Sequence, residues 1–168
     1  MTQQPTRQSS IDTAPADVRH DVTVSVPRAH AFRVFTEQFD LVKPREHNLL
    51  DVAIARTVLE PRVGGSVYDI GVDGSQCHWA RVLAFEPPER LVLAWQIGAD
   101  WELETDPARA SEVEIRFVAV GPQQTRVELR HRHLERHGEG WEHARAALDG
   151  ANGWPLYVAR FVDLLGVG

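Results

Sequence analysis

Two stretches of sequence decide the fold of this chain. Residues 86–95 read EPPERLVLAW, and residues 153–165 read GWPLYVARFVDLL. In the first stretch, two consecutive prolines set a turn that leads directly into an apolar strand ending at Trp95. In the second, large apolar side chains recur every three or four residues, after a proline suited to the first turn of a helix. We therefore predict a sheet of hairpins wrapped around a final helix, with room for a cavity between the two.

Length and composition predict one ordinary domain. The chain has 168 residues, of which 43% are hydrophobic and 25% charged, as is typical of a globular protein. Residues 1–16 are polar, with almost nothing to bury, and are predicted to form a disordered leader. Residues 17–168 are predicted to form the single domain, because no linker or repeat divides them.

Charge and cysteine content exclude several classes of protein. The net charge of −6 argues against nucleic acid and against an anionic membrane as partners. No apolar run approaches the ~20 residues that span a bilayer, and the first ten residues lack the core of a signal peptide. The single cysteine, Cys77, rules out an internal disulfide framework. We predict a cytoplasmic protein.

The periodicity of apolar residues predicts an α+β order. Strands alternate apolar and polar residues, and they are predicted over 18–26, 52–59, 66–71, 76–86, 90–97, 112–120 and 125–134. Helices are predicted from Pro27 to Glu37, over 140–148, and over the last stretch with Asn152 as its cap. Residues 39–50 are predicted to be an irregular connector with a short helical turn. One strand, one helix, many antiparallel strands and late helices make an α+β domain, not a doubly wound one.

The order of these motifs resembles the helix-grip fold of the START-like (SRPBCC) superfamily, and in detail the branch named after the activator of the heat-shock-protein ATPase. The motifs that carry the resemblance are Pro27, Gly64-Gly65 ahead of Tyr68, Asp73-Gly74, residues 88–91 leading to Trp95, residues 125–129 and Gly153-Trp154. The resemblance covers roughly residues 17–165. It implies a curved antiparallel sheet wrapped around a long C-terminal helix.

That resemblance leaves the function open, because the superfamily includes lipid carriers, hormone receptors, polyketide cyclases and co-chaperone domains. One departure from the pattern is the helical insert over residues 138–150, which is longer than the loop of many relatives. We expect this insert to reshape the mouth of a cavity.

Aromatic residues are the candidates for lining such a cavity. The ten candidates are Phe35, Tyr68, Trp79, Trp95, Trp101, Phe117, Trp141, Trp154, Tyr157 and Phe161. The competing interpretation is ordinary core packing, which we favour for Trp95 and Trp154. Trp101 lies in a predicted loop and Trp141 in the insert, where a pocket or lid role is as plausible as packing.

Four histidines lie within thirteen residues: His131, His133, His137 and His143. The first two are two apart on a predicted strand, so they share a face and could hold a metal with Glu135 or Glu139. The interleaved residues Arg130, Arg132 and Arg136 oppose a metal by their charge. We therefore predict an exposed cluster, or one at the cavity rim, and no metal site.

Nucleophilic and cofactor chemistry lack a motif. Cys77 and His78 are neighbours on a predicted strand, so their side chains point to opposite faces. Gly64-Gly65 matches neither a phosphate loop nor a dinucleotide fingerprint, and it predicts a bulge or a positive φ at the head of a strand. Glu112 and Glu114 fall on the polar, solvated face of their strand. We predict no cofactor.

Three functions remain as hypotheses. The leading one is a non-catalytic module that binds a small hydrophobic ligand between the sheet and the last helix. The second is a protein-interaction domain that docks on a chaperone or another protein. The third is a cyclase- or dehydratase-like enzyme that uses cavity histidines and carboxylates as acid and base. Whether the chain forms a homodimer is left open.

Overall fold

The computed structural model describes residues 17–166, so the leader predicted for residues 1–16 lies outside the described part. Its seven strands form one antiparallel sheet in the order β1-β7-β6-β5-β4-β3-β2. The strands are β1 Val18–Val24, β2 Ile54–Leu59, β3 Ser66–Gly71, β4 Gln76–Glu86, β5 Arg90–Trp95, β6 Ser111–Gly121 and β7 Gln124–Arg132. The hairpin between β4 and β5 pairs Glu86 with Arg90, so the two prolines form its turn.

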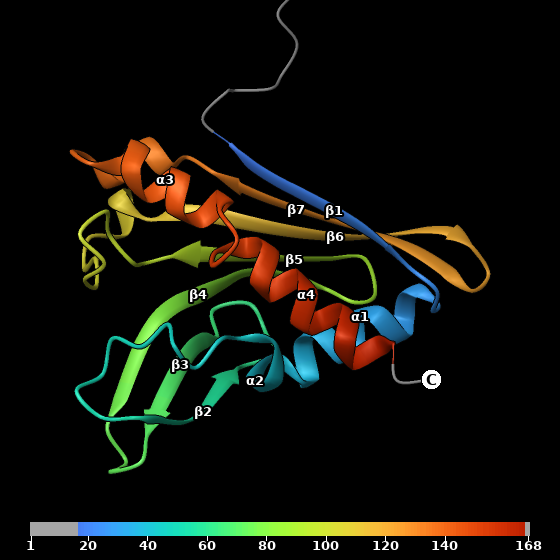
Figure 1. Cartoon of the computed structure of the whole chain (residues 1–168), viewed down its shortest axis with the longest axis horizontal. Helices are drawn as coiled ribbons and strands as arrows, with labels where there is room; N and C mark the ends of the chain where they lie inside the picture. Colours follow the sequence, from blue (N-terminus) through green and yellow to red (C-terminus); the bar gives the residue numbers. More distant parts are fainter. Residues whose placement is uncertain (1–16, 167–168) are drawn as a thin grey trace, which may run out of the picture.

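The helices lie on one side of this curled sheet, as Figure 1 shows. They are α1 Arg28–Glu37, α2 Phe39–Val42, α3 Trp141–Asp149 and α4 Trp154–Leu165, with short 3-10 turns η1 Pro107–Arg109 and η2 Leu134–His137. Helix α4 crosses the concave face diagonally, and α1 and α2 lie beside its C-terminal half (Figure 1). The predicted helix-grip α+β fold is confirmed.

Several predicted boundaries need correction. Strand β1 ends at Val24, and β2 begins only at Ile54. The N-cap of α4 is Gly153 rather than Asn152, and no side chain caps this helix. A Cβ atom on Gly153 would lie 2.1 Å from the carbonyl oxygen of Leu148, so the tight turn between α3 and α4 requires glycine at this position.

The core lies between α4 and the concave face of the sheet. Phe161 of α4 is 1% exposed, and its ring lies 5.3 Å from the ring of Phe35 on α1. Phe117 of β6 lies 6.0 Å from the same Phe35 ring. Edge-on contacts of this kind stabilise a core beyond simple burial. These phenylalanines fill one half of the concave face, and the indoles described below lie on the other half.

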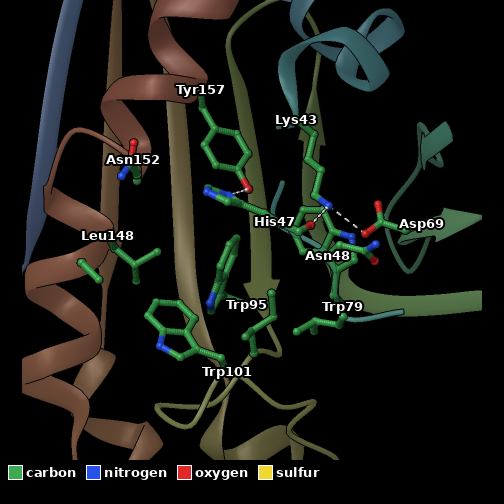
Figure 2. A pocket seen from close by; sticks show the side chains of 14 residues that line it. Lys43, His47, Asn48, Asp69, Trp79, Trp95, Trp101, Leu148, Asn152 and Tyr157 are labelled. Atoms are coloured by element: carbon green, nitrogen blue, oxygen red, sulfur yellow. Dashed lines mark hydrogen bonds and ion pairs between the residues drawn. The ribbon is translucent and has the colours of Figure 1, made fainter. Parts of the chain in front are cut away.

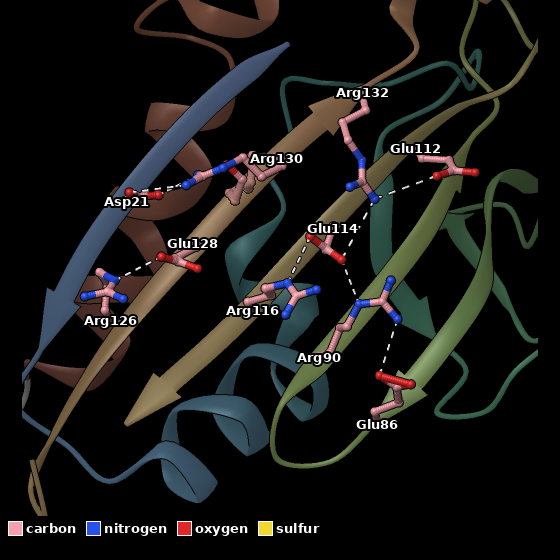
Figure 3. Close-up of polar contacts among 11 residues, drawn as sticks. Asp21, Glu86, Arg90, Glu112, Glu114, Arg116, Arg126, Glu128, Arg130 and Arg132 are labelled. Carbon is pink, nitrogen blue, oxygen red and sulfur yellow. Dashed lines mark hydrogen bonds and ion pairs between the residues drawn. The ribbon is translucent and has the colours of Figure 1, made fainter. Parts of the chain in front are cut away.

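The convex face carries ion pairs that run from strand to strand (Figure 3). Glu114 of β6 is only 4% exposed and accepts hydrogen bonds from Arg90 at 2.7 Å and Arg116 at 3.1 Å. Burial alone would raise the pKa of Glu114, but these two guanidinium groups outweigh it and lower the pKa. The prediction that Glu114 is solvated is therefore wrong, because Arg116 of the same strand and Arg90 and Arg132 of the two neighbouring strands lie around it.

No helix within residues 17–166 is long and apolar enough to cross a membrane.

Candidate ligand-binding cavity

A cavity of about 310 Å³ lies between the start of α4, the connector after α2 and strands β3 to β5 (Figure 2). Its lining residues are Lys43, His47, Asn48, Leu49, Asp69, Trp79, Trp95, Ile97, Trp101, Ala147, Leu148, Asn152, Gly153 and Tyr157. The cavity falls within the range of small-molecule sites, which begins at about 300 Å³.

Three indole rings form the aromatic walls. Trp79 is 1% exposed, and its ring meets that of Trp95 edge-on at 5.3 Å. Trp101 is 40% exposed and has φ of 64°, an uncommon backbone conformation for a bulky residue. It belongs to the loop between β5 and β6, at the outer end of the cavity. The cavity therefore has a rigid inner aromatic wall and a half-exposed ring at its mouth.

A buried ion pair forms a polar flank. The Lys43 ammonium donates a hydrogen bond to Asp69 at 2.8 Å and another to the backbone carbonyl of His47. Asp69 also accepts a hydrogen bond from the Thr57 hydroxyl at 2.6 Å. Burial lowers the pKa of Lys43, and the hydrogen bond and charge of Asp69 oppose that effect only in part. The pair ties the connector after α2 to strand β3.

His47 and Tyr157 form a second polar group at the cavity. The His47 Nδ1 atom lies 3.4 Å from the Tyr157 hydroxyl. Burial is the main reason that the pKa of His47 is lowered, and the charge of Lys43 adds to it. Burial raises the pKa of the Tyr157 phenol. At neutral pH the site therefore contains a neutral imidazole next to a protonated phenol, which is a base beside an acid.

A hydrogen-bonded chain runs behind the aromatic wall. The Trp154 indole donates to His131 Nδ1 at 3.0 Å, and the Ser111 hydroxyl lies 2.7 Å from Nε2 of both His131 and His137. Because the indole only donates, a neutral His131 carries its proton on Nε2 and donates to Ser111, whose hydroxyl then donates to His137. The pKa of His131 is lowered to about 3, mainly by burial and to a smaller extent by the charge of His137.

These contacts correct the prediction of an exposed histidine cluster. His131 is fully buried and His137 is 4% exposed, because β7 turns the first inward and η2 folds the second under β6. His133 is only half-buried and His143 is exposed. No three histidine, cysteine or carboxylate side chains come together as a metal site among residues 17–166. Cys77 is buried while His78 is exposed, so these two neighbours do face opposite sides.

The ten predicted lining residues fall into three groups. Trp79, Trp95, Trp101 and Tyr157 line the cavity. Phe35, Phe117, Trp154 and Phe161 are buried in the adjoining core, and Trp141 of α3 is partly buried against it. Tyr68 needs correction, because it lies on the other face of β3 from Asp69 and stacks on His78 at 4.4 Å.

The polar lining was not predicted from the sequence: Lys43, His47, Asn48, Asp69 and Asn152. One signal was available for Asp69. It shares a face of β3 with the buried residues Val67 and Gly71, so an acidic residue on an inward face pointed to a buried charge. For the other four, which lie in irregular connections, periodicity contained no such signal.

Comparisons with known proteins agree with this architecture. The family model described as Activator of Hsp90 ATPase homolog 1-like protein matches residues 25–166. A solved anthrahydroquino-gamma-pyrone synthase, Txn09, complexed with SUM, is 40% identical over 88% of this chain and 96% of that chain, with a TM-score of 0.61. CalC of Micromonospora echinospora, described as a self-sacrificing resistance protein, is 32% identical over 89% and 93%, with a TM-score of 0.62.

An HSP90 activator from Plasmodium falciparum has a TM-score of 0.58 over 89% of this chain and 96% of that chain. Its identity is 20%, so the likeness bears on the fold alone. No curated protein matches the sequence.

Proposed function

The chain belongs to the family of Activator of Hsp90 ATPase homolog 1-like proteins, in the START-like (SRPBCC) superfamily, and from this premise we propose that its cavity binds one small, mostly apolar aromatic molecule. The observation that carries the proposal is the cavity of about 310 Å³ with indole walls from Trp79, Trp95 and Trp101. Flat indole faces favour a flat ring system as ligand, because aromatic rings gain energy by stacking or meeting edge-on.

One relative supports a fused aromatic ligand over a lipid chain. It is a synthase named for an anthrahydroquino-gamma-pyrone, and it is 40% identical over 88% of this chain. That name describes a fused aromatic ring system. A ligand of that class fits a cavity that is mostly apolar and has a few polar groups in its lining, among them Lys43, Asp69 and His47.

The direct test is titration with 1,8-dihydroxyanthraquinone, followed by quenching of tryptophan fluorescence. We expect saturable binding that weakens about tenfold in Trp101→Ala, which corresponds to about 1.4 kcal/mol of lost ring contact. Leu103→Ala is the matched control, because Leu103 lies in the same loop and is 45% exposed, close to the 40% of Trp101, but does not line the cavity. Absence of saturable binding by the wild-type protein would overturn the proposal.

Acid–base catalysis on the bound molecule is the second candidate function. His47 as a neutral base and Tyr157 as a protonated acid, 3.4 Å apart at the cavity, favour it. The 40% identity to a synthase adds support. Anthrone is a suitable probe, since its methylene protons exchange with deuterium from heavy water under base catalysis. Acceleration by the protein that is lost in His47→Gln would support catalysis, and a rate equal to that in buffer would exclude it for this probe.

Docking on a chaperone stays an untested alternative, because the likeness to an HSP90 activator is at 20% identity. A homodimer and a cytoplasmic location also remain predictions.

A further inference from the structure

The inner wall of the cavity is almost fully covered. Trp79 and Trp95 line the cavity, yet they are only 1% and 4% exposed, and Tyr157 is 2% exposed. The open space of the cavity therefore touches these rings only slightly. A flat molecule of fused rings can lie against them only after part of the lining has moved aside, so ligand entry requires a segment that moves.

Two parts of the lining are held in place by contacts with other elements. The connector after α2 is tied to β3 by the buried ion pair of Lys43 and Asp69, at 2.8 Å. The turn between α3 and α4 is packed so tightly that Gly153 has no room for a Cβ atom. Either part can move only by breaking such contacts.

The hairpin tip at the start of the loop between β5 and β6, residues 98–102, lacks ties of this kind. Its hydrogen bonds all close on the tip itself, between Gly98 and Glu102, between Gly98 and Trp101, and between Asp100 and Glu102. Within residues 17–166, no hydrogen bond or ion pair joins the tip to another segment. The tip is attached through its base, where residues 97 and 103 pair. It can therefore tilt about that base without losing a hydrogen bond.

Trp101 lies on this tip and differs from the other two indoles of the cavity. Trp79 and Trp95 contact each other edge-on, and Trp95 also contacts Trp154, whereas Trp101 contacts no aromatic ring among residues 17–166. Figure 2 shows its ring at the end of the cavity opposite Tyr157. The backbone of Trp101, with φ of 64°, is unfavourable for a residue with a Cβ atom, and strain of this kind is typical of ligand clamps.

We propose that residues 98–102 are a lid, which tilts outward to admit the ligand and then closes with the Trp101 ring against its face. The inference rests on the proposed function, and it adds the route by which the ligand enters. The ligand itself becomes the ring partner that Trp101 lacks. The closed lid rests against the start of α3, where a Cβ atom on Gly140 would lie 3.7 Å from the Cβ atom of Ala99.

A reversible disulfide tests the lid. The Cβ atoms of a disulfide are about 3.8 Å apart, so Ala99→Cys combined with Gly140→Cys should lock the tip to α3. Gly140 has a positive φ, so a cysteine there lowers stability, and the reduced form of the same double variant is therefore the reference. Cys77 is buried, which keeps it out of this disulfide. In stopped-flow quenching of tryptophan fluorescence, 1,8-dihydroxyanthraquinone should associate at least about tenfold more slowly with the oxidised form than with the reduced form.

A second measurement needs no disulfide. Trp101→Ala shortens the lid, so association should be about threefold faster and dissociation about thirtyfold faster, which together give the tenfold loss of affinity expected above. Leu103→Ala is the matched control and should leave both rates within about twofold of the wild type. A fixed wall would change dissociation alone.

The outcomes separate the lid from the proposed function. Equal association rates in the oxidised and reduced forms, or an unchanged association rate in Trp101→Ala, would overturn the lid while leaving aromatic binding intact. Absence of binding by the wild-type protein would instead count against the proposed function itself.

Discussion

Mild acid should destabilise this protein through His131. The ring is fully buried, and its pKa in the folded state is about 3, compared with the ordinary value of 6.5. Well above pH 6.5 the ring is neutral in both the folded and the unfolded chain, so its titration does not change the free energy of unfolding. Below that pH the unfolded chain binds a proton that the folded chain cannot bind, so the free energy of unfolding falls as pH falls toward 3.

The magnitude follows from the two pKa values. Between about pH 7.5 and pH 5.5 the unfolded ring gains nearly a full proton while the folded ring stays neutral, so His131 alone should lower the free energy of unfolding by about 1.4 kcal/mol. His47 and His137 act in the same direction, because burial lowers the pKa of each. The wild-type loss should therefore be at least that large.

Urea unfolding at the two pH values measures this loss, and His131→Gln removes the titrating ring. The variant will be less stable at both pH values, but its loss between them should be smaller than that of the wild type by about 1.4 kcal/mol. An unchanged pH dependence in His131→Gln would refute the reasoning. So would an NMR titration of the wild-type protein in which the His131 ring gains its proton near pH 6.

Three further predictions concern the packing of α4, a buried ion pair and the turn before α4. Phe161→Ala should cost about 3–5 kcal/mol in urea unfolding, because the ring is close-packed outside the cavity. The control Arg160→Ala loses only an exposed ion pair and should cost less than about 1 kcal/mol. Equal small losses in the two variants would contradict the packing of α4. Lys43→Met should lower the free energy of unfolding by about 3–5 kcal/mol, because it leaves Asp69 buried without its partner. Adding Asp69→Leu to Lys43→Met should recover most of that stability. If stability is not recovered, the unpaired charge of Asp69 is not the cause of the loss. Gly153→Ala should lower stability by about 3 kcal/mol, because a Cβ atom collides with a backbone carbonyl; a neutral effect in thermal unfolding would mean that the turn before α4 is adaptable.

Sequence periodicity predicted the framework well, because it reports how each segment meets the core. The two-residue alternation predicted over 112–120 matched the buried residues Val113, Ile115 and Phe117 of β6 but not Ala119, which is exposed. The three-to-four spacing after Gly153 matched the bounds of α4. Gly64 has a positive φ, one of the two outcomes predicted for Gly64-Gly65. Each of these signals is local, so the chain carries it before any tertiary contact forms.

The chemistry of the cavity depended on contacts between segments far apart in the chain. Lys43 meets Asp69 across 26 positions, and Trp154 meets His131 across 23. A polar residue is solvated or buried according to what lies over it, which is why His131 and Glu114 were both expected at the surface and are both buried.

The sequence by itself thus determined the order of elements, the inward face of most strands and the apolar stripe of α4, since these follow from local backbone geometry and the burial of apolar area. The curvature of the sheet and the path of residues 43–50 across its open end decided which polar groups converge. Burial then set the protonation states of these groups, because removing a charge from water is costly. The sequence pattern does not show which polar side chains become buried.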